Sequence, residues 1–355
     1  MKLGIFSVVD HYPKLVDRSV GQFYSELLGQ CALADELGLD SFWIAEHHFH
    51  EYGAIPRPAI WMAAAAQRTK KIKLGAAVVV LPFDNPLRSA EDFAMVDVLS
   101  GGRLKLGVGS GYLKHEFAGF NIEGSEKRER FDEALQIFLE AWKGDSFSFS
   151  GKYNTVSDVS LNIVPVQTPT PPVYVAVLSN EAAVHVGKRG MPVMMIPYAT
   201  TEAIDELAAV ARSYHAAYRE ATEAAADYHQ EKSSPPVSTA KTSNQAQCGS
   251  LAFGLHTYCA PTTAQARAEA REWLDRYVQT RLYARQRSFD ELIERDLIAV
   301  GDPDEVLRVA RRYGDAGLNE FLAITNFGGA PDHKVRESIK LMAEHVMPAL
   351  ATVRT

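Results

Sequence analysis

The residues best suited to chemistry lie in one short segment, which reads FWIAEHH over residues 42–48. Four consecutive apolar residues favour a buried parallel strand. Glu46, His47 and His48 follow directly, so a carboxylate and two imidazoles lie at the C-terminal end of that strand. In parallel α/β proteins, ligands and reacting groups collect at this end of the sheet. The segment is therefore the first candidate for a functional site.

The two histidines are consecutive, and consecutive side chains of an extended chain point to opposite faces. We therefore expect one imidazole to face a ligand and the other to be a hydrogen-bonded structural residue. A metal site is disfavoured, because Glu46, His47, His48 and His50 lack the i, i+4 spacing of zinc enzymes. The cysteines do not add a metal-binding pair, since all three lie far apart in the sequence.

A second candidate segment, GVGSGY over residues 107–112, ends a later strand. Its glycines, Gly109 among them, would let a ligand or another stretch of backbone approach closely. His115 and Glu116 come next, in a loop that we expect to cover the mouth of the site. A pair of solvated loop residues is the alternative interpretation of these two side chains.

A phosphate site is predicted where Ser179 and Asn180 open a helix directly after another strand. The free amides at a helix start bind anions, although a simple N-cap also explains Ser179. Arg128 and Arg130 would add charge-assisted hydrogen bonds to such an anion. The alternative is that the charged run over residues 125–130 is only a solvated helix start.

The elements that must position these side chains alternate between strand and helix. The pattern predicts a (β/α)₈ TIM barrel in one domain over residues 1–355. A doubly wound sheet gives similar local patterns, but no Gly-x-Gly-x-x-Gly follows the first strand, so a dinucleotide-binding domain is disfavoured. The expected strands cover residues 3–9, 42–45, 72–81, 104–108, 173–177, 192–196, 251–259 and 321–325.

Two insertions are expected in this barrel, a hairpin at 147–158 and a polar loop at about 229–249. The loop contains two prolines and few core residues, which predicts mobility, with a linker between domains as the rival interpretation. Because it precedes a strand, it is attached on the N-terminal side of the barrel. We therefore expect it to move without gating catalysis.

Composition excludes several classes of function. The net charge is −7 and the pI is about 5.9, which disfavours binding to nucleic acid. No apolar run approaches the ~20 residues of a membrane span, and the N-terminus has no signal-peptide pattern. We expect a cytoplasmic protein that acts on a small molecule.

Several segments, taken together and in this order, resemble the bacterial luciferase-like family of flavin-dependent monooxygenases. The resemblance covers nearly the whole chain except roughly residues 227–249. The segments that carry it are WIAEHHF at 43–49, LGAAVVVLP at 74–82, NPLR at 85–88, DVLSGGR at 97–103, PVYV at 172–175, KRGMP at 188–192 and residues 342–348.

The resemblance implies a barrel that binds a flavin at its C-terminal mouth. His47 matches the family's catalytic histidine, and Glu116 matches the acidic residue that follows the fourth strand. The flavin phosphate would contact Arg128 and Ser179, together with Asn180. The resemblance implies four further flavin-binding positions. Ala77 and Val78 align with a non-proline cis peptide beneath the ring. Gly109 and Ser110 stand where luciferase has a cysteine and an arginine.

The implied activity is a monooxygenase that uses reduced FMN, delivered by a separate reductase, and dioxygen to oxygenate a small organic substrate. A deazaflavin-dependent hydride-transfer enzyme is the closest rival, and a non-catalytic flavin-binding partner subunit is a second. The helices expected at 58–67 and 89–99 carry many apolar residues. We expect them to contribute to a two-fold homodimer, as the resemblance also implies.

Overall fold

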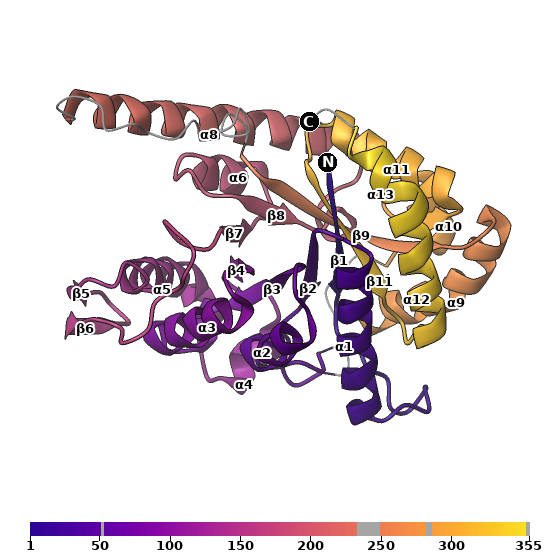
Figure 1. Cartoon of the computed structure of the whole chain (residues 1–355), viewed down its shortest axis with the longest axis horizontal. Coiled ribbons are helices and arrows are strands. Elements are labelled where there is room, and N and C mark those ends of the chain that lie inside the picture. Colours follow the sequence, from indigo (N-terminus) through magenta and orange to yellow (C-terminus); the bar gives the residue numbers. More distant parts are fainter. Residues whose placement is uncertain (51–52, 233–248, 282–285, 353–355) are drawn as a thin grey trace.

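The computed structural model describes residues 1–50, 53–232, 249–281 and 286–352. Eight parallel strands close into a barrel, in which β8 pairs with β9 to complete the ring (Figure 1). The strands in ring order are β9 (Leu251–Cys259), β11 (Glu320–Asn326), β1 (Lys2–Ser7), β2 (Ser41–Ile44), β3 (Lys73–Val80), β4 (Leu104–Gly109), β7 (Val173–Ala176) and β8 (Val193–Met195). The predicted (β/α)₈ barrel and its expected strands are confirmed.

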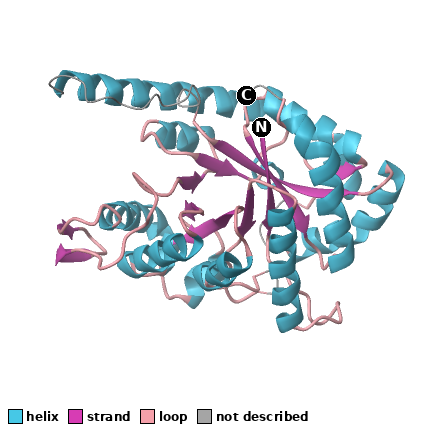
Figure 2. Ribbon diagram, viewed as in Figure 1, coloured by secondary structure: helices cyan, strands magenta, loops and turns pink. Residues whose placement is uncertain are grey.

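Helices surround the strands on the outside of the barrel (Figure 2). Their bounds are α1 (Val20–Glu36), α2 (Pro58–Arg68), α3 (Pro86–Ser100), α4 (Lys114–Gly119), α5 (Lys127–Ala141), α6 (Asn180–Gly187), α7 (Pro197–Thr200), α8 (Ile204–Lys232), α9 (Thr263–Thr280), α10 (Phe289–Glu294), α11 (Pro303–Asp315), α12 (Asp332–Leu341) and α13 (Met347–Leu350). A 3₁₀ turn, Leu81–Phe83, follows β3, a second, Gly124–Glu126, precedes α5, and a π-helical turn, Met342–Val346, joins α12 to α13.

Helix α3 shows how local sequence sets these bounds. The side chain of Asn85 caps its start by accepting hydrogen bonds from the amides of Leu87 and Arg88. Pro86 occupies the first helical position, where its fixed φ suits the helix and no amide hydrogen is needed. Gly101 ends the helix with φ at +68°, a left-handed conformation that glycine adopts without steric cost. The capping residues recognised in the sequence are therefore the ones that begin and end this helix.

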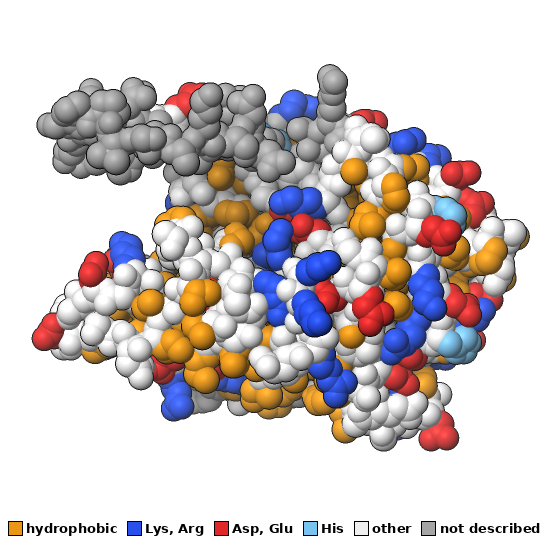
Figure 3. All heavy atoms as spheres, viewed as in Figure 1, with side chains coloured by type: hydrophobic (Ala, Val, Ile, Leu, Met, Phe, Trp, Pro, Cys, Tyr) orange, Lys and Arg blue, Asp and Glu red, His pale blue; other side chains and the backbone are white. Residues whose placement is uncertain are grey.

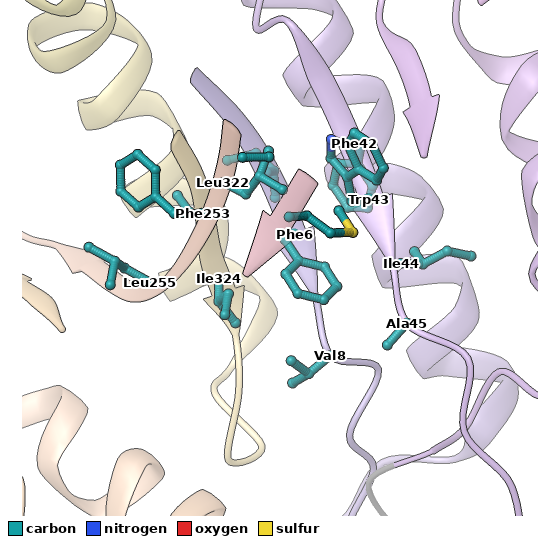
Figure 4. Close-up of a cluster of buried hydrophobic side chains, with 14 of the residues drawn as sticks. Phe6, Val8, Phe42, Trp43, Ile44, Ala45, Phe253, Leu255, Leu322 and Ile324 are labelled. Atoms are coloured by element: carbon teal, nitrogen blue, oxygen red, sulfur yellow. The ribbon is translucent and has the colours of Figure 1, made fainter. Parts of the chain in front are cut away.

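The interior of the barrel is filled with large apolar side chains. Figure 4 shows Phe6 and Trp43 of neighbouring strands beside Leu322 and Ile324 of β11. Trp43 also packs edge-on against Tyr174, with the ring centroids 5.4 Å apart. The barrel is thus a packed core up to the level of its C-terminal mouth, as this fold requires.

The N-terminal end of the barrel holds a buried charge network. Lys105, on β4, donates to Asp40 at 3.0 Å and to Glu320, the first residue of β11, at 2.9 Å. The hydroxyl of Tyr174 donates to the same Glu320 carboxylate at 2.7 Å. Each buried charge therefore has a partner, which is the condition for tolerating charge away from water.

Several elements differ from the sequence-based expectation. A short strand, β10 (Ala299–Gly301), pairs with β9 outside the ring and was not expected. The predicted hairpin is confirmed as β5 (Phe147–Ser150) paired with β6 (Thr155–Val159). Helix α8 continues to Lys232, past the expected start of the polar loop at 229, because its alanine- and glutamate-rich sequence favours helix. The rest of that loop, residues 233–248, lies outside the described residues.

No helix within the described ranges is both long enough and apolar enough to cross a lipid bilayer.

Candidate active site

A cavity of about 440 Å³ lies at the C-terminal ends of the barrel strands. Its volume falls within the range of small-molecule sites, roughly 300–1,000 Å³. Asn180 does not line it. The sequence-predicted residues that do are His47, Ala77, Val78, Gly109, Ser110, Glu116, Arg128 and Ser179. Positions from five separate segments of the chain are thus brought to one cavity.

His47 and Glu116 form a hydrogen-bonded pair in the wall of this cavity. The Nδ1 atom of His47 lies 3.2 Å from Oε1 of Glu116. The same oxygen accepts the backbone amide of His48 at 2.9 Å. Glu116 is 1% exposed and belongs to the short helix α4, whose His115 also lies 3.1 Å from the backbone carbonyl of His48. The carboxylate therefore fixes both the imidazole ring and the backbone that carries it.

Burial lowers the pKa of His47 below its ordinary value of 6.5, and the charge of Arg281 lowers it further. The hydrogen bond and negative charge of Glu116 oppose this change without reversing it. His47 is therefore neutral at pH 7. A neutral ring that donates Nδ1–H to a carboxylate keeps its second nitrogen as a proton acceptor, so the pair is arranged for general acid–base chemistry.

His48 points to the other side of the strand, as alternation predicted. Its Nε2 atom lies 3.1 Å from Oε1 of Glu46. The ring packs edge-on against Phe83 and Phe120, with centroid distances of 5.9 and 4.7 Å. Glu46, His48 and these aromatic rings line a separate outer cavity of about 290 Å³. Glu46 lines both cavities, so the end of β2 is their common wall.

The wall formed by β3 and β4 contains the cis peptide bond between Ala77 and Val78. The pairing of the two strands shifts register there, between Ala76 and Val79. Gly109 faces this point, where an added Cβ would lie 2.8 Å from Cγ2 of Val78. Gly109 therefore allows the close approach of a neighbouring strand, because a side chain at this position would meet Val78.

The predicted phosphate end of the cavity is built from the starts of two helices. Ser179 caps α6 by accepting the amide of Ala182 at 3.2 Å. Lys127 and Arg128 begin α5 and also line the cavity, and Arg128 has no hydrogen-bond or ion-pair partner among the described residues. Arg130 does not line the cavity, because Glu126 binds it at 2.8 Å and its guanidinium lies over Tyr153.

Sequence reasoning missed one cationic residue of this site, Arg281. Arg281 lines the cavity just after the end of α9 and is 8% exposed. It donates to the hydroxyl of Tyr112, which also lines the cavity, at 3.1 Å. From the sequence alone, an arginine at the end of an amphipathic helix is expected to be exposed to solvent. Only the closure of the barrel shows that this one turns inward.

No cluster of three or more potential metal ligands occurs in the part of the chain that the structure describes. The donor set of the cavity suits an organic cofactor with an anionic group instead. Cationic side chains and a helix start line the cavity, together with aliphatic side chains and a neutral histidine. The residues present therefore fit a flavin nucleotide.

Fold and site together define a parallel barrel with a cofactor-sized cavity at its strand ends. The sequence model of the luciferase-like monooxygenase family matches residues 1–320, and the chain belongs to that family of oxidoreductases and monooxygenases. This is the family that its sequence motifs indicated.

The relatives include both flavin and deazaflavin enzymes. The chain is 29% identical to an F420-dependent glucose-6-phosphate dehydrogenase of Amycolatopsis mediterranei, over 92% of this chain and 94% of that one. It is 31% identical to the oxygenase component of a flavin-dependent trigonelline monooxygenase of Acinetobacter baylyi, over 51% of this chain and 52% of that one. The chain spans about half the length of the first curated relatives that it matches, 46% and 52%.

Among solved structures, the monooxygenase RslO1 of Streptomyces bottropensis superimposes with a TM-score of 0.85. It is 27% identical, and the match covers 98% of this chain and 99% of that chain. The similarity therefore extends over the entire barrel.

Proposed function

We propose that this chain is the oxygenase of a two-component system. It would take reduced FMN from a separate reductase, use dioxygen, and oxygenate a small organic substrate. The observation that carries the proposal is the neutral His47, fixed by Glu116 in a cavity with an aliphatic wall and a cationic end. The similarity to a flavin-dependent oxygenase component and to a solved monooxygenase supports it.

Reduced FMN, when bound, would supply the two electrons with which one oxygen atom enters the substrate and the other leaves as water. The protein would do the rest. Arg128 and the amides at the start of α6 would hold the phosphate, because a guanidinium and a helix N-terminus both bind anions. The aliphatic wall, with Val78, would exclude water from the ring. His47 would accept and return a proton at its ring nitrogen.

A second candidate is a deazaflavin-dependent hydride-transfer enzyme. The specific observation in its favour is the F420-dependent dehydrogenase that matches 92% of this chain. The same histidine and carboxylate would serve as acid and base, but dioxygen would not react. A non-catalytic flavin-binding subunit is the third possibility, and the intact His47–Glu116 pair argues against it.

The deciding experiment measures the binding of reduced FMN and reduced F420 to the purified chain, followed by oxygen consumption with a panel of organic substrates. We expect FMN to bind and oxygen to be consumed when substrate is present. Binding of reduced F420 alone, with substrate turnover and no oxygen uptake, would establish the second candidate. Flavin binding with no turnover under any condition would favour the third.

The phosphate assignment has its own matched test. Arg128→Gln should weaken FMN binding about ten-fold, because it removes a charge-assisted contact. It should leave the binding of riboflavin, which lacks the phosphate, unchanged. Arg130→Gln is the control, since that arginine is held by Glu126 away from the cavity. Equal losses for FMN and riboflavin would show that Arg128 does not contact the phosphate.

A further inference from the structure

Two neighbouring methionines, Met194 and Met195, line the cavity that the proposed function assigns to the flavin. They end β8 and are 6% and 7% exposed. Methionine usually enters a protein interior as a flexible apolar side chain that fills irregular gaps. Packing alone therefore accounts for both residues, unless the position of one sulfur atom gives it a chemical role.

Strand pairing places Met194 on the inner face of the barrel. It lies in register with Ala176 of β7 and Ala252 of β9. Ala176 lines the cavity. Gly254 also lines it, and Gly254 points to the same side of β9 as Ala252 because the two are separated by two residues. Strand alternation directs Met195 to the opposite side of β8, so Met194 is the methionine that faces inward.

The sulfur atom of Met194 lies beside the wall that contains the cis peptide bond. Gly107, on β4, leaves room for it, because an added Cβ there would lie 2.8 Å from Sδ of Met194. The same added Cβ would lie 3.2 Å from Cγ1 of Val78, which follows the cis bond and lines the cavity. The thioether is therefore next to the aliphatic wall that the proposed function places against the flavin ring.

A thioether at this place can react with the by-product of the proposed reaction. When no organic substrate is present, dioxygen takes up two electrons and two protons and becomes hydrogen peroxide. Peroxide converts methionine to its sulfoxide. One peroxide oxygen forms a bond to sulfur while the O–O bond breaks, and the other oxygen takes the displaced proton and leaves as water. The sulfur loses the two electrons that the peroxide gains.

We propose that Met194 is the site at which this enzyme is oxidised by the hydrogen peroxide that it forms, and that the sulfoxide weakens flavin binding. This inference rests on the proposed function, which supplies the peroxide. The added oxygen would be a polar group among aliphatic side chains, and it would enlarge a side chain in a packed wall. Reaction with dioxygen in the absence of substrate would therefore limit itself.

The test follows the oxidation of each methionine by peptide mass spectrometry. The purified chain is supplied with reduced FMN and dioxygen but no organic substrate, and catalase removes peroxide from the bulk solution. We expect Met194 to be oxidised under these conditions, whereas Met95, which is 49% exposed, stays reduced. Hydrogen peroxide added without FMN or catalase should reverse this order, because an exposed thioether then meets the oxidant first.

Matched variants connect the modification to flavin binding. The affinity of the wild type for FMN should fall about ten-fold after the substrate-free reaction, because the sulfoxide places a polar group in an apolar wall. Met194→Leu has an apolar side chain of similar size without the sulfur, so it should keep the affinity that it had before the reaction. Met195→Leu is the control and should lose affinity as the wild type does.

Two results would overturn the proposal. One is that Met194 stays reduced in the presence of reduced FMN, dioxygen and catalase, and the other is a loss of affinity that persists in Met194→Leu. If Met194→Leu does not fold, as thermal unfolding would show, mass spectrometry of the wild type still decides.

Failure of the proposed function is separable from failure of this inference. Binding of reduced FMN is measured first, and its absence would remove both. If an organic substrate is oxygenated but Met194 stays reduced when that substrate is left out, the proposed function stands and this inference alone fails.

Discussion

At the scale of single residues, the site depends on one carboxylate oxygen that serves two groups. Oε1 of Glu116 contacts Nδ1 of His47 and accepts the amide of His48. The amide contact fixes the backbone, so the ring of His47 is presented to the cavity in one orientation. Preorganisation of this kind reduces what must be rearranged when substrate arrives.

Replacing His47 with Ala should leave the barrel folded, since the ring lies at a strand end rather than in the packed interior. Product formation should fall by roughly 10²–10⁴-fold, the usual contribution of a positioned acid–base group. Oxygen uptake should continue, with more of it released as hydrogen peroxide. The measurement is product formed per reduced flavin consumed.

His48→Ala is the matched comparison, because its ring packs among Phe83 and Phe120 outside the cavity. It should lower thermal stability more than His47→Ala does. If His47→Ala formed as much product per reduced flavin as the wild type, this histidine would not be the catalytic group.

The pKa of His47 predicts the acid side of the pH–rate profile. Burial sets it below 6.5, so a step that needs the neutral ring should be active at pH 7 and lost as the pH falls through that lowered value. Glu116→Gln removes the charge that raises this pKa, so the acid limb should move to still lower pH while the maximal rate also falls. The profile of kcat/KM against pH measures both changes. An acid limb that moves to higher pH would contradict this assignment.

At the scale of elements, periodicity and capping signals in the sequence predicted the strands, the hairpin and the helix starts. Asn85 and Gly101 mark the two ends of α3 because capping acts within one turn of chain. The sequence also placed His47 and Ser179 at strand ends. The sequence did not predict β10, because its three residues become a strand only by pairing with β9. It also did not predict that Arg281 lines the cavity, because that placement depends on the closure of the barrel. Features created by long-range contact carry no local signal.

The network at the bottom of the barrel predicts a large effect on stability. Lys105→Met would remove the buried cation of Glu320 and leave it only Lys2, whose half-exposed side chain lies 3.9 Å from the carboxylate. Removing one partner of a buried pair costs about 3–5 kcal/mol. Chemical denaturation at pH 7 measures the loss. Lys73→Met is the matched control, since Lys73 binds Asp40 from a side chain that is 42% exposed. That variant should change the free energy of unfolding by about 1 kcal/mol or less.

The sign of the pH dependence follows from Glu320. Burial raises the pKa of Glu320, but the charge of Lys105 and the hydrogen bonds of Ser250 and Tyr174 bring it below the ordinary 4.5. Its contribution to stability is therefore present at neutral pH and lost as the pH falls below that value. In Lys105→Met the main opposing charge is gone, so the difference between variant and wild type should shrink in acid. A difference that stays constant from pH 7 to pH 4 would rule out this network as its cause.

At the scale of the whole molecule, apolar side chains lie on the surface along α2 and α3. Figure 3 shows hydrophobic side chains along the lower edge of the molecule, where Figure 1 places these helices. Ile60 is 72% exposed, and Met95, Val98 and Leu99 are each at least 40% exposed. An apolar surface of this kind is typical of an interface, so the predicted homodimer would bury it.

We expect a dimer at micromolar concentration by sedimentation velocity. Ile60→Glu should shift the equilibrium toward monomer, because it places a charge in an apolar contact. Val20→Glu changes an exposed apolar residue on α1 in the same way and should leave the mass unchanged. A monomeric wild type would show that these side chains merely cover the barrel.

The wall shared by the two cavities has a consequence for how this chain tolerates mutation. Phe83 and Phe120 line only the outer cavity, yet they hold the ring of the residue whose amide reaches Glu116. A change of volume there should therefore disturb the backbone that carries His47. In a library of random variants, these two positions should therefore tolerate few substitutions, and screening for activity would flag them as if they belonged to the catalytic set.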